Sequence, residues 1–394
     1  MHGRDCVRAA LLDIAFDSPV LVVAIGKAAS AMTLGALDVL GGQIERGLVV
    51  TKHGYVEPPV SSHQRLTIIE AGHPIPDEHS LEAGARLVEF IAGAPADATL
   101  LFLVSGGASA LVELLPRGIG LADLARANQW LQGAGLPIDA INRVRKRLSC
   151  IKGGRLARHL GGRRTLNLLI SDVPGDVVGD IGSGLLVADA ADDRLLPAHL
   201  PPWLARLMSA AAPVPDGAGP EFAGVATQIV ASAALARRAA ANAACRLGYD
   251  VTAHEGLVTG DAAIEGRRLA KFAMAAGPGI HVWSGETTVM LPDRPGRGGR
   301  NQHLALAVAG EMAGRADLLF LAGATDGGDG PGRDAGAIID GDTIMRGERA
   351  GLNSGESLKA ADSGRFLDAA GDLVGTGPTG TNVMDLLVAL RIRA

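Results

Sequence analysis

The chain has 394 residues, of which 47% are hydrophobic and 20% charged, a balance typical of a folded protein with two or three domains. A net charge of −5 and an aromatic content of 3% argue against nucleic acid or an acidic membrane as a partner. The three cysteines are too widely spaced for a disulfide framework, and neither a signal peptide nor a membrane-spanning run is expected, so we predict a cytoplasmic protein.

In the first half of the chain, short apolar runs end repeatedly in glycine-rich polar loops. Strands are predicted near 20–25, 47–51, 66–70, 99–104 and 166–171, and helices over 28–40, 80–91, 121–132 and 141–160. This alternation is typical of α/β layers around a parallel sheet. Small residues after a buried parallel strand let backbone N–H groups approach an anion, so we expect phosphate or carboxylate at these loops.

A proline- and glycine-rich stretch at 212–220 indicates a boundary between two domains, over residues 1–220 and 221–394. The second domain is predicted to be a smaller α/β unit. Its strands are expected near 227–231, 250–253, 280–283, 318–322 and 337–339, and its helices over 235–247 and 304–312. The basic segment 141–160 suggests nucleic acid at first sight, but the acidic total charge favours a solvated or anion-facing helix.

Two strand-to-helix loops of the first half carry the first candidate residues. Lys27 follows Gly26 directly after a predicted strand, where its ammonium group would lie beside a bound phosphate. A Walker A loop is excluded, because Leu21 stands where that motif needs glycine. The turn Ser105–Ser109 crowds two serines and two glycines together, which favours anion binding over a purely steric need for glycine.

Aspartates and arginines supply the next candidates. Asp172, with Asp176 and Asp180, and Asp326, with Asp329, offer the oxygen ligands that Mg²⁺ prefers, although single aspartates often only cap their own turn. The loop that ends at Arg300 places glycines beside guanidinium groups that can bind phosphate in a bidentate fork.

The run Gly375–Gly380 matches the dinucleotide pattern G-x-G-x-x-G, but we do not interpret it as a cofactor site. No clear strand leads into it, and too few residues follow to complete a βαβ unit with its acidic residue. The threonines and Asn382 that follow still offer donors to a ligand.

A set of segments in order along the chain resembles one family. They include GKAASAM, AGHPIPDEHS, SGGASAL, SDVPGD, GRGGRNQHLAL, ATDGGDGPGRDAGA and TGPTGTNVMDLL. Together they are similar to the glycerate 2-kinases with a MOFRL C-terminal domain. The resemblance implies transfer of the γ-phosphoryl group of ATP to the 2-hydroxyl of D-glycerate with Mg²⁺. It also implies a Rossmann-like N-terminal domain, a smaller α/β C-terminal domain and an active site in the cleft between them.

The family's active-site lysine and arginine match Lys27 and Arg300, which agrees with the candidates chosen from the residues themselves. We therefore predict that Lys27 and Arg300 contact the transferring phosphoryl group and that Asp172 orients or deprotonates the attacking hydroxyl, or holds Mg²⁺. The remaining assignments are substrate binding by Ser105, Gly106, Gly107 and Ser109, nucleotide binding by Gly26, Gly298, Gly299, Asn301, Thr379 and Asn382, and metal binding by Asp172 and Asp326.

Two other functions stay open. Some members of the family are labelled hydroxypyruvate reductases, but an NAD(P)H-dependent reductase needs a dinucleotide fingerprint that this sequence lacks. A non-enzymatic module that binds sugar acids would not need Lys27 and Arg300 to converge. The expected partners are D-glycerate and ATP, without nucleic acid or membrane, and a homodimer stays open.

Overall fold

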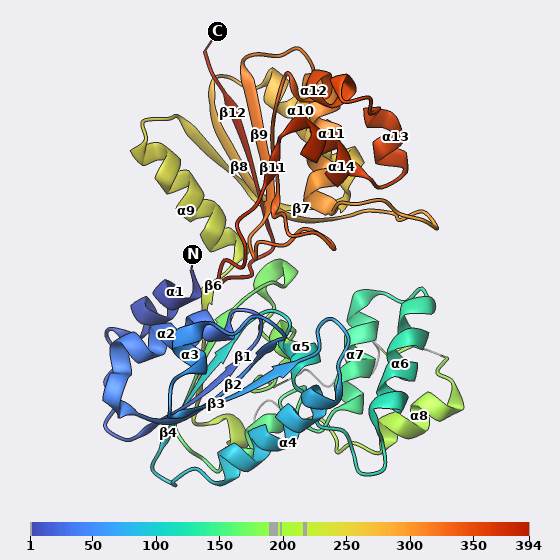
Figure 1. Ribbon diagram of the computed structural model, residues 1–394. Helices are drawn as coiled ribbons and strands as arrows, with labels where there is room; N and C mark the ends of the chain where they lie inside the picture. The colour runs from blue at the N-terminus through green and yellow to red at the C-terminus, as the bar shows by residue number, and fades with distance from the viewer. Residues whose placement is uncertain (1, 189–195, 198, 216–218, 394) are drawn as a thin grey trace. The chain divides into compact units, whose positions relative to one another are not determined.

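The computed structural model describes residues 2–188, 196–197, 199–215 and 219–393, and it divides the chain into two compact units, His2–Val230 and Ala231–Ala394 (Figure 1). The sequence placed this boundary at 220. Each unit has a six-stranded sheet and its own hydrophobic core. No helix within the described part of the chain is long and apolar enough to cross a membrane.

The first unit contains a sheet with the strand order β3-β2-β1-β4-β5-β6. Its strands are β1 (Val20–Ile25), β2 (Ile44–Lys52), β3 (Leu66–Ala71), β4 (Thr99–Val104), β5 (Thr165–Ile170) and β6 (Val225–Ala231). Strands β1 to β5 pair in parallel with their neighbours. This order is that of the Rossmann fold, in which ligands bind outside the carboxyl ends of the strands where the order reverses, between β1 and β4.

Helices cover both faces of this sheet. All six residues of β1 are buried, and Leu21, Val23 and Ile25 pack in one cluster with Leu87 and Ile91 of helix α4. Figure 1 shows α2 on the opposite face. The helices of this part are α1 (Gly3–Leu11), α2 (Ala29–Leu40), α3 (Pro58–Ser61), α4 (Glu78–Ala92) and α5 (Ala108–Leu111), with a 3₁₀ turn η1 (Gly41–Gln43).

Three further helices form a lobe with a hydrophobic cluster of its own. They are α6 (Leu121–Gly133), α7 (Ile138–Leu148) and α8 (Pro202–Ser209), and their buried apolar residues include Leu124, Val144 and Leu204. We call this group the helical lobe. Short 3₁₀ turns complete the unit: η2 (Arg155–His159), η3 (Pro174–Asp176), η4 (Ile181–Ser183) and η6 (Pro220–Phe222).

The predicted helix over 141–160 is wrong, because α7 ends at Leu148. Gly153 and Gly154 follow with φ angles of 62° and 81°, a left-handed conformation that no α-helix accepts. The basic segment was expected to be solvated or to face anions, and two of its lysines do the latter. Lys146 and Lys152 are 4% and 3% exposed, because both are turned inward onto carboxylates.

The second unit contains a mixed sheet with the order β11-β10-β9-β12-β8-β7. The strands are β7 (Val251–Asp261), β8 (Gly279–Thr288), β9 (Leu318–Ala324), β10 (Gly336–Asp340), β11 (Leu373–Val374) and β12 (Asp385–Arg391). β7 and β8 are parallel, and β12 runs antiparallel to both β8 and β9. Because β12 lies inside the sheet, it brings the segment before it next to the ends of β8 and β9.

Helix α9 (Ala233–Arg246) lies on one face of this sheet, and α10 (Ala262–Ala275) and α11 (Arg300–Met312) lie on the other (Figure 1). The remaining helices are α12 (Thr343–Arg349), α13 (Ser354–Lys359) and α14 (Ser363–Ala370). Helix α11 is buried along most of its length, because small and aliphatic residues occupy every side from Leu304 to Ala309.

Candidate active site

The loops after β1 and β4 are joined at the carboxyl end of the parallel sheet. The amide of Lys27 donates to the carbonyl of Gly106 at 2.9 Å, and the amide of Ala28 donates to Oγ of Ser105 at 3.1 Å. Gly26 has a φ of 131°, and a Cβ there would lie 2.1 Å from Oγ of Ser105. Only glycine permits this close approach, so the sequence fixes the two loops against each other.

Lys27 and His73 converge on the second of these loops. A Cβ on Gly107, whose φ is 86°, would lie 3.4 Å from Cγ of Lys27 and 3.0 Å from Cδ2 of His73. Gly107 therefore leaves room for a cationic and an imidazole side chain at the start of α5. The sequence predicted the positions of Lys27 and Gly107, whereas His73 was set aside as part of a structural turn.

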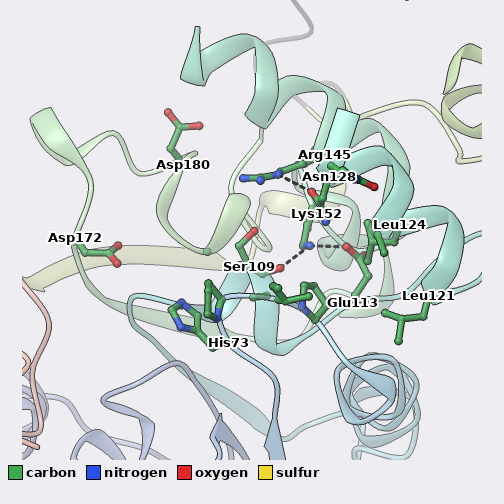
Figure 2. A pocket seen from close by; sticks show the side chains of 18 residues that line it. His73, Ser109, Glu113, Leu121, Leu124, Asn128, Arg145, Lys152, Asp172 and Asp180 are labelled. Atoms are coloured by element: carbon green, nitrogen blue, oxygen red, sulfur yellow. Dashed lines mark hydrogen bonds and ion pairs between the residues drawn. The ribbon is translucent and has the colours of Figure 1, made fainter. Parts of the chain in front are cut away.

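A cavity of about 490 Å³ opens at the same edge of the sheet. One side is formed by the loops at the strand ends, through Gly107, Ser109 and Asp172, and another by the helical lobe, through Leu124 and Asn128 (Figure 2). The other lining residues are His73, Pro74, Ile75, Pro76, Ala110, Glu113, Leu121, Ala125, Gln129, Arg145, Lys152, Asp180 and Gly182. This volume suits a small organic molecule.

The cavity contains charges of both signs. Lys152 donates to Oε2 of Glu113 at 2.5 Å and to the carbonyl of Ser109 at 2.7 Å, and both charged side chains are nearly inaccessible to solvent. Figure 2 shows this lysine aimed between its two acceptors. A buried pair of this kind fixes the positions of its members, because removal of either leaves an uncompensated charge.

Arg145 and Asp172 point into the open space of the cavity from opposite sides (Figure 2). Nε of Arg145 donates to Oδ1 of Asn128 at 3.0 Å, which orients the guanidinium group. Burial lowers the pKa of Arg145, yet an arginine stays charged at neutral pH. Asp180, which also lines the cavity, is paired with Lys146 at 2.8 Å.

The structure thus places three of the predicted site residues, Gly107, Ser109 and Asp172, on one cavity. Ser105 is fully buried with its hydroxyl turned to the β1 loop, so its own contact with a ligand stays a prediction. Arg145 and Lys152 were missed as individual site residues. The sequence showed a basic segment, but its pattern did not distinguish the side chains that point into the protein from those that point to solvent.

The second unit holds the other predicted residues, around the start of α11. Arg300 donates two hydrogen bonds to the carboxylate of Asp385, from Nε at 2.7 Å and from Nη2 at 3.0 Å. Its Nη1 donates to Glu286 at 2.9 Å. Asp385 begins β12 and Glu286 lies on β8, so the strand order described above assembles this cluster. Neither carboxylate was predicted, because the contacts span 85 and 14 residues.

Burial raises the pKa of Asp385 to about 6, although Arg300 opposes that rise. Burial also lowers the pKa of Arg300, but the hydrogen bond and charge of Asp385 outweigh burial and leave it above its ordinary value. The guanidinium is therefore a permanent cation, held in one orientation with about a third of the side chain exposed.

Asp329 occupies the N-terminus of α11. Its carboxylate accepts from the backbone amides of Asn301 at 3.0 Å and Gln302 at 2.8 Å and from the side chain of Asn301 at 3.2 Å. A Cβ on Gly299 would lie 2.4 Å from Asp329, and one on Gly298 would lie 2.6 Å from Oγ of Ser363. These glycines thus serve close packing, and nucleotide contacts by Gly298, Gly299 and Asn301 stay predictions.

The segments after β9 and before β12 are bound to each other. Oγ1 of Thr325 donates to the carbonyl of Met384 at 2.6 Å, and Thr379 donates to the carbonyl of Thr325. Oδ1 of Asp326 accepts from the amide of Gly328 at 3.1 Å, which is the local turn expected of such an aspartate. Asn382 is buried on the same segment. Ligand contacts by Thr379, Asn382 and Asp326 stay predictions.

Comparison with known proteins agrees with this two-part architecture. Residues 3–201 match a family described as a domain of unknown function, DUF4147, and residues 279–385 match the MOFRL family. A protein from Thermotoga maritima named D-glycerate 2-kinase is 33% identical over 94% of this chain and 90% of its own length. A Pyrococcus horikoshii protein named glycerate 2-kinase is 34% identical over 94% of this chain and 87% of its own length. An Agrobacterium vitis protein named putative hydroxypyruvate reductase is 36% identical over 94% and 98%.

A solved structure agrees as well. The crystal structure of glycerate kinase from Thermotoga maritima superposes with a TM-score of 0.88 at 32% identity, covering all of this chain and 96% of the other. The chain therefore belongs to the family that joins a DUF4147 domain to a MOFRL domain and that includes the D-glycerate 2-kinases.

Proposed function

We propose that the protein phosphorylates D-glycerate at its 2-hydroxyl group, with ATP as the donor. The similarity to a D-glycerate 2-kinase along nearly the full length of both chains carries this proposal. The cavity supports it, because its size and its arginine suit a small carboxylic acid. In this reaction the 2-hydroxyl oxygen bonds to the γ-phosphorus, the bond from that phosphorus to the β,γ-bridging oxygen breaks, and the hydroxyl proton leaves.

The residues of the first unit would bind and orient the acceptor. The Gly107–Ser109 end of the β4 loop and Arg145 would hold the carboxylate. Asp172 faces the same space and would accept the hydroxyl proton or orient the hydroxyl. Lys27, beside Gly107, would place positive charge on the transferring phosphoryl oxygens.

Arg300 would supply further positive charge to the phosphoryl group. Asp385 and Glu286 keep it in one orientation, which spares the reorganisation that a loose side chain would need in the transition state. Nucleotide contacts by Gly26, Thr379 and Asn382 belong to the same proposal.

Mg²⁺ fits the acidic residues present. Asp172 aims a carboxylate into the cavity, Asp180 also lines it, and such oxygens are the ligands that Mg²⁺ prefers. As the alternative to its role at the hydroxyl, Asp172 would hold the ion, and Asp326 is the other candidate ligand. The bound ion would neutralise charge on the phosphates of the nucleotide.

The test is a coupled assay of ADP release with ATP, Mg²⁺ and D-glycerate. We expect ADP to be released only when D-glycerate is present, with 2-phosphoglycerate as the product. Formation of 3-phosphoglycerate would overturn the position of transfer but not the kinase activity.

A reductase is the rival, because some relatives carry that name. The β1 loop of a dinucleotide-binding Rossmann domain needs several glycines around the pyrophosphate. Here a single glycine, Gly26, is packed against Ser105, and Lys27 follows it. We expect no oxidation of NADH or NADPH with hydroxypyruvate. Such oxidation without ADP release in the kinase assay would overturn the proposal.

A further inference from the structure

Two histidines and an aspartate meet outside the lining of the cavity, where β2 ends and α4 begins. His53 follows β2 directly, Asp77 is the residue before α4, and His79 lies in the first turn of that helix. Each offers one ligand atom, and these atoms lie within 4.8 Å of one another. Among the residues that the structure describes, His53, Asp77 and His79 are the one group of three His, Cys, Asp or Glu side chains whose ligand atoms lie this close together.

We propose that His53, Asp77 and His79 form a binding site for a divalent transition-metal ion, with Zn²⁺ as the representative ligand. Two imidazoles and one carboxylate are a donor set that suits zinc, nickel or copper. Mg²⁺ prefers oxygen ligands only, so this site is chemically distinct from the Mg²⁺ of phosphoryl transfer.

Asp77 is held in place before any metal arrives. Its Oδ1 accepts from the amide and the hydroxyl of Ser80, at 3.0 and 3.2 Å, in the capping box of α4. This leaves Oδ2 directed at Nε2 of His53, at 2.9 Å, and Nδ1 of His79, at 3.7 Å. Although burial opposes ionisation, hydrogen bonds from His53, Gly72 and Ser80 keep the pKa of Asp77 well below its usual range.

The two separations from Asp77 suit a tetrahedral zinc site, and the ligand atoms of the two histidines lie within 4.8 Å of each other. Metal–ligand bonds of about 2.0–2.2 Å put neighbouring ligand atoms roughly 3.3 Å apart, and the two separations from Oδ2 lie on either side of that value. The two imidazole rings are 5.6 Å apart and nearly perpendicular, so they do not stack face to face. Both histidines are more than half exposed, which leaves room for a water ligand.

A hydrogen bond between His53 and Asp77 explains one of these contacts without a metal. Nδ1 of His79 approaches the same carboxylate oxygen from the first turn of α4, so all three donors face one point. A bound ion would replace the proton between His53 and Asp77 and would join the end of β2 to the start of α4. Asp77 follows Pro76, so the ion would also anchor one end of the segment His73–Pro76 that lines the cavity.

The experiment is a calorimetric titration of the full-length protein with ZnCl₂, after treatment with a chelator and with MgCl₂ in excess. We expect one Zn²⁺ per chain with micromolar or tighter affinity and a rise in melting temperature. His53→Ala and His79→Ala should each weaken binding at least tenfold. Asp77 is left intact, because its substitution would also remove the helix cap.

His254→Ala is the matched control. It removes one member of a histidine pair elsewhere, in which Nε2 of His254 lies 3.0 Å from Nδ1 of His281, and it should leave Zn²⁺ affinity unchanged. Far-ultraviolet circular dichroism of each variant checks the fold, and His53→Gln and His79→Gln serve as second variants. Absence of stoichiometric binding, or equal affinity in all variants, would overturn the proposal.

Discussion

At the scale of single residues, Arg300 shows how a candidate catalytic cation is held. Two of its nitrogens bind Asp385 and a third binds Glu286, an arrangement that the single ammonium group of lysine cannot reproduce. We expect Arg300→Ala to lower kcat about 10³-fold and Arg300→Lys to restore little of it, measured by ADP release. Arg297→Lys is the control, since Arg297 lies on the same loop but pairs with Asp334 and Asp368 in an exposed position. Near wild-type turnover in Arg300→Lys would contradict the claim that catalysis needs the two-pronged guanidinium group.

Lys27 offers a second test at this scale. Lys27→Met keeps most of the apolar stem beside Gly107 and removes the charge, so the fold should survive while kcat falls by roughly 10³-fold. The measurements are steady-state kinetics and melting temperature. Lys359→Met, which removes an exposed lysine paired with Glu356, should change neither. A variant Lys27→Met with normal kcat would remove Lys27 from the mechanism.

Asp385 gives a prediction on pH. Its folded pKa of about 6 exceeds the unfolded value of about 3.9, so the folded protein binds more protons between these pH values. The contribution of Asp385 to stability therefore falls as pH rises from about 4 to about 6, by on the order of 2 kcal/mol. In Asp385→Asn this contribution is absent. Between about pH 4.5 and 6.5, the free energy of unfolding in urea should fall more steeply with pH in the wild type than in Asp385→Asn. Equal slopes against pH would contradict the raised pKa of Asp385.

At the scale of elements, the joined loops after β1 and β4 depend on one glycine. Gly26→Ala would force a Cβ into Ser105 at a φ that alanine rarely adopts, so we expect destabilisation of about 3 kcal/mol or more. Gly42→Ala is the matched control, because nothing lies within 4 Å of a Cβ there. Denaturant titration of both variants measures the difference. If the two variants are equally stable, the close approach of the loops is not needed.

Elements with a strong local signal could be predicted from the sequence, and those set by distant contacts could not. The fully buried run of β1 and the apolar run of β4 were predicted with the bounds observed, because a buried parallel strand is a continuous apolar segment. β12 was missed, since its place between β8 and β9 depends on chain segments far away. The strand near 227–231 was predicted to open the second unit, but β6 joins the first sheet.

The candidate site follows the same rule. Lys27 and the β4 turn could be found because small residues after a strand are a local pattern. Asp385 and Glu286 could not, because a carboxylate that holds Arg300 looks like any other in the sequence. Arg145 and Lys152 turn inward through contacts with Asn128 and with Ser109 and Glu113, which lie 17 to 43 residues away in the sequence.

At the scale of the whole molecule, each of the two units has its own core, and tryptophans lie in both. Trp130 and Trp203 lie in the first unit and Trp283 in the second. We expect their unfolding transitions to differ in denaturant midpoint, because separate cores unfold separately. Fluorescence of Trp283→Phe reports on the helical lobe of the first unit, and that of a Trp130→Phe, Trp203→Phe double variant reports on the second unit. Coincident transitions in both proteins would show that the chain unfolds as one cooperative body.

The helical lobe has a consequence for how this family can diversify. Helix α6 presents Leu121, Ala125, Asn128 and Gln129 to the cavity, while the apolar cluster that stabilises the lobe is separate from the core beneath the sheet. Substitutions along this one helix can reshape the space around an acceptor molecule without disturbing the loops after β1 and β4. A library confined to Leu121, Ala125 and Gln129, which keeps Asn128 to orient Arg145, is therefore a direct route to kinases for other hydroxy acids.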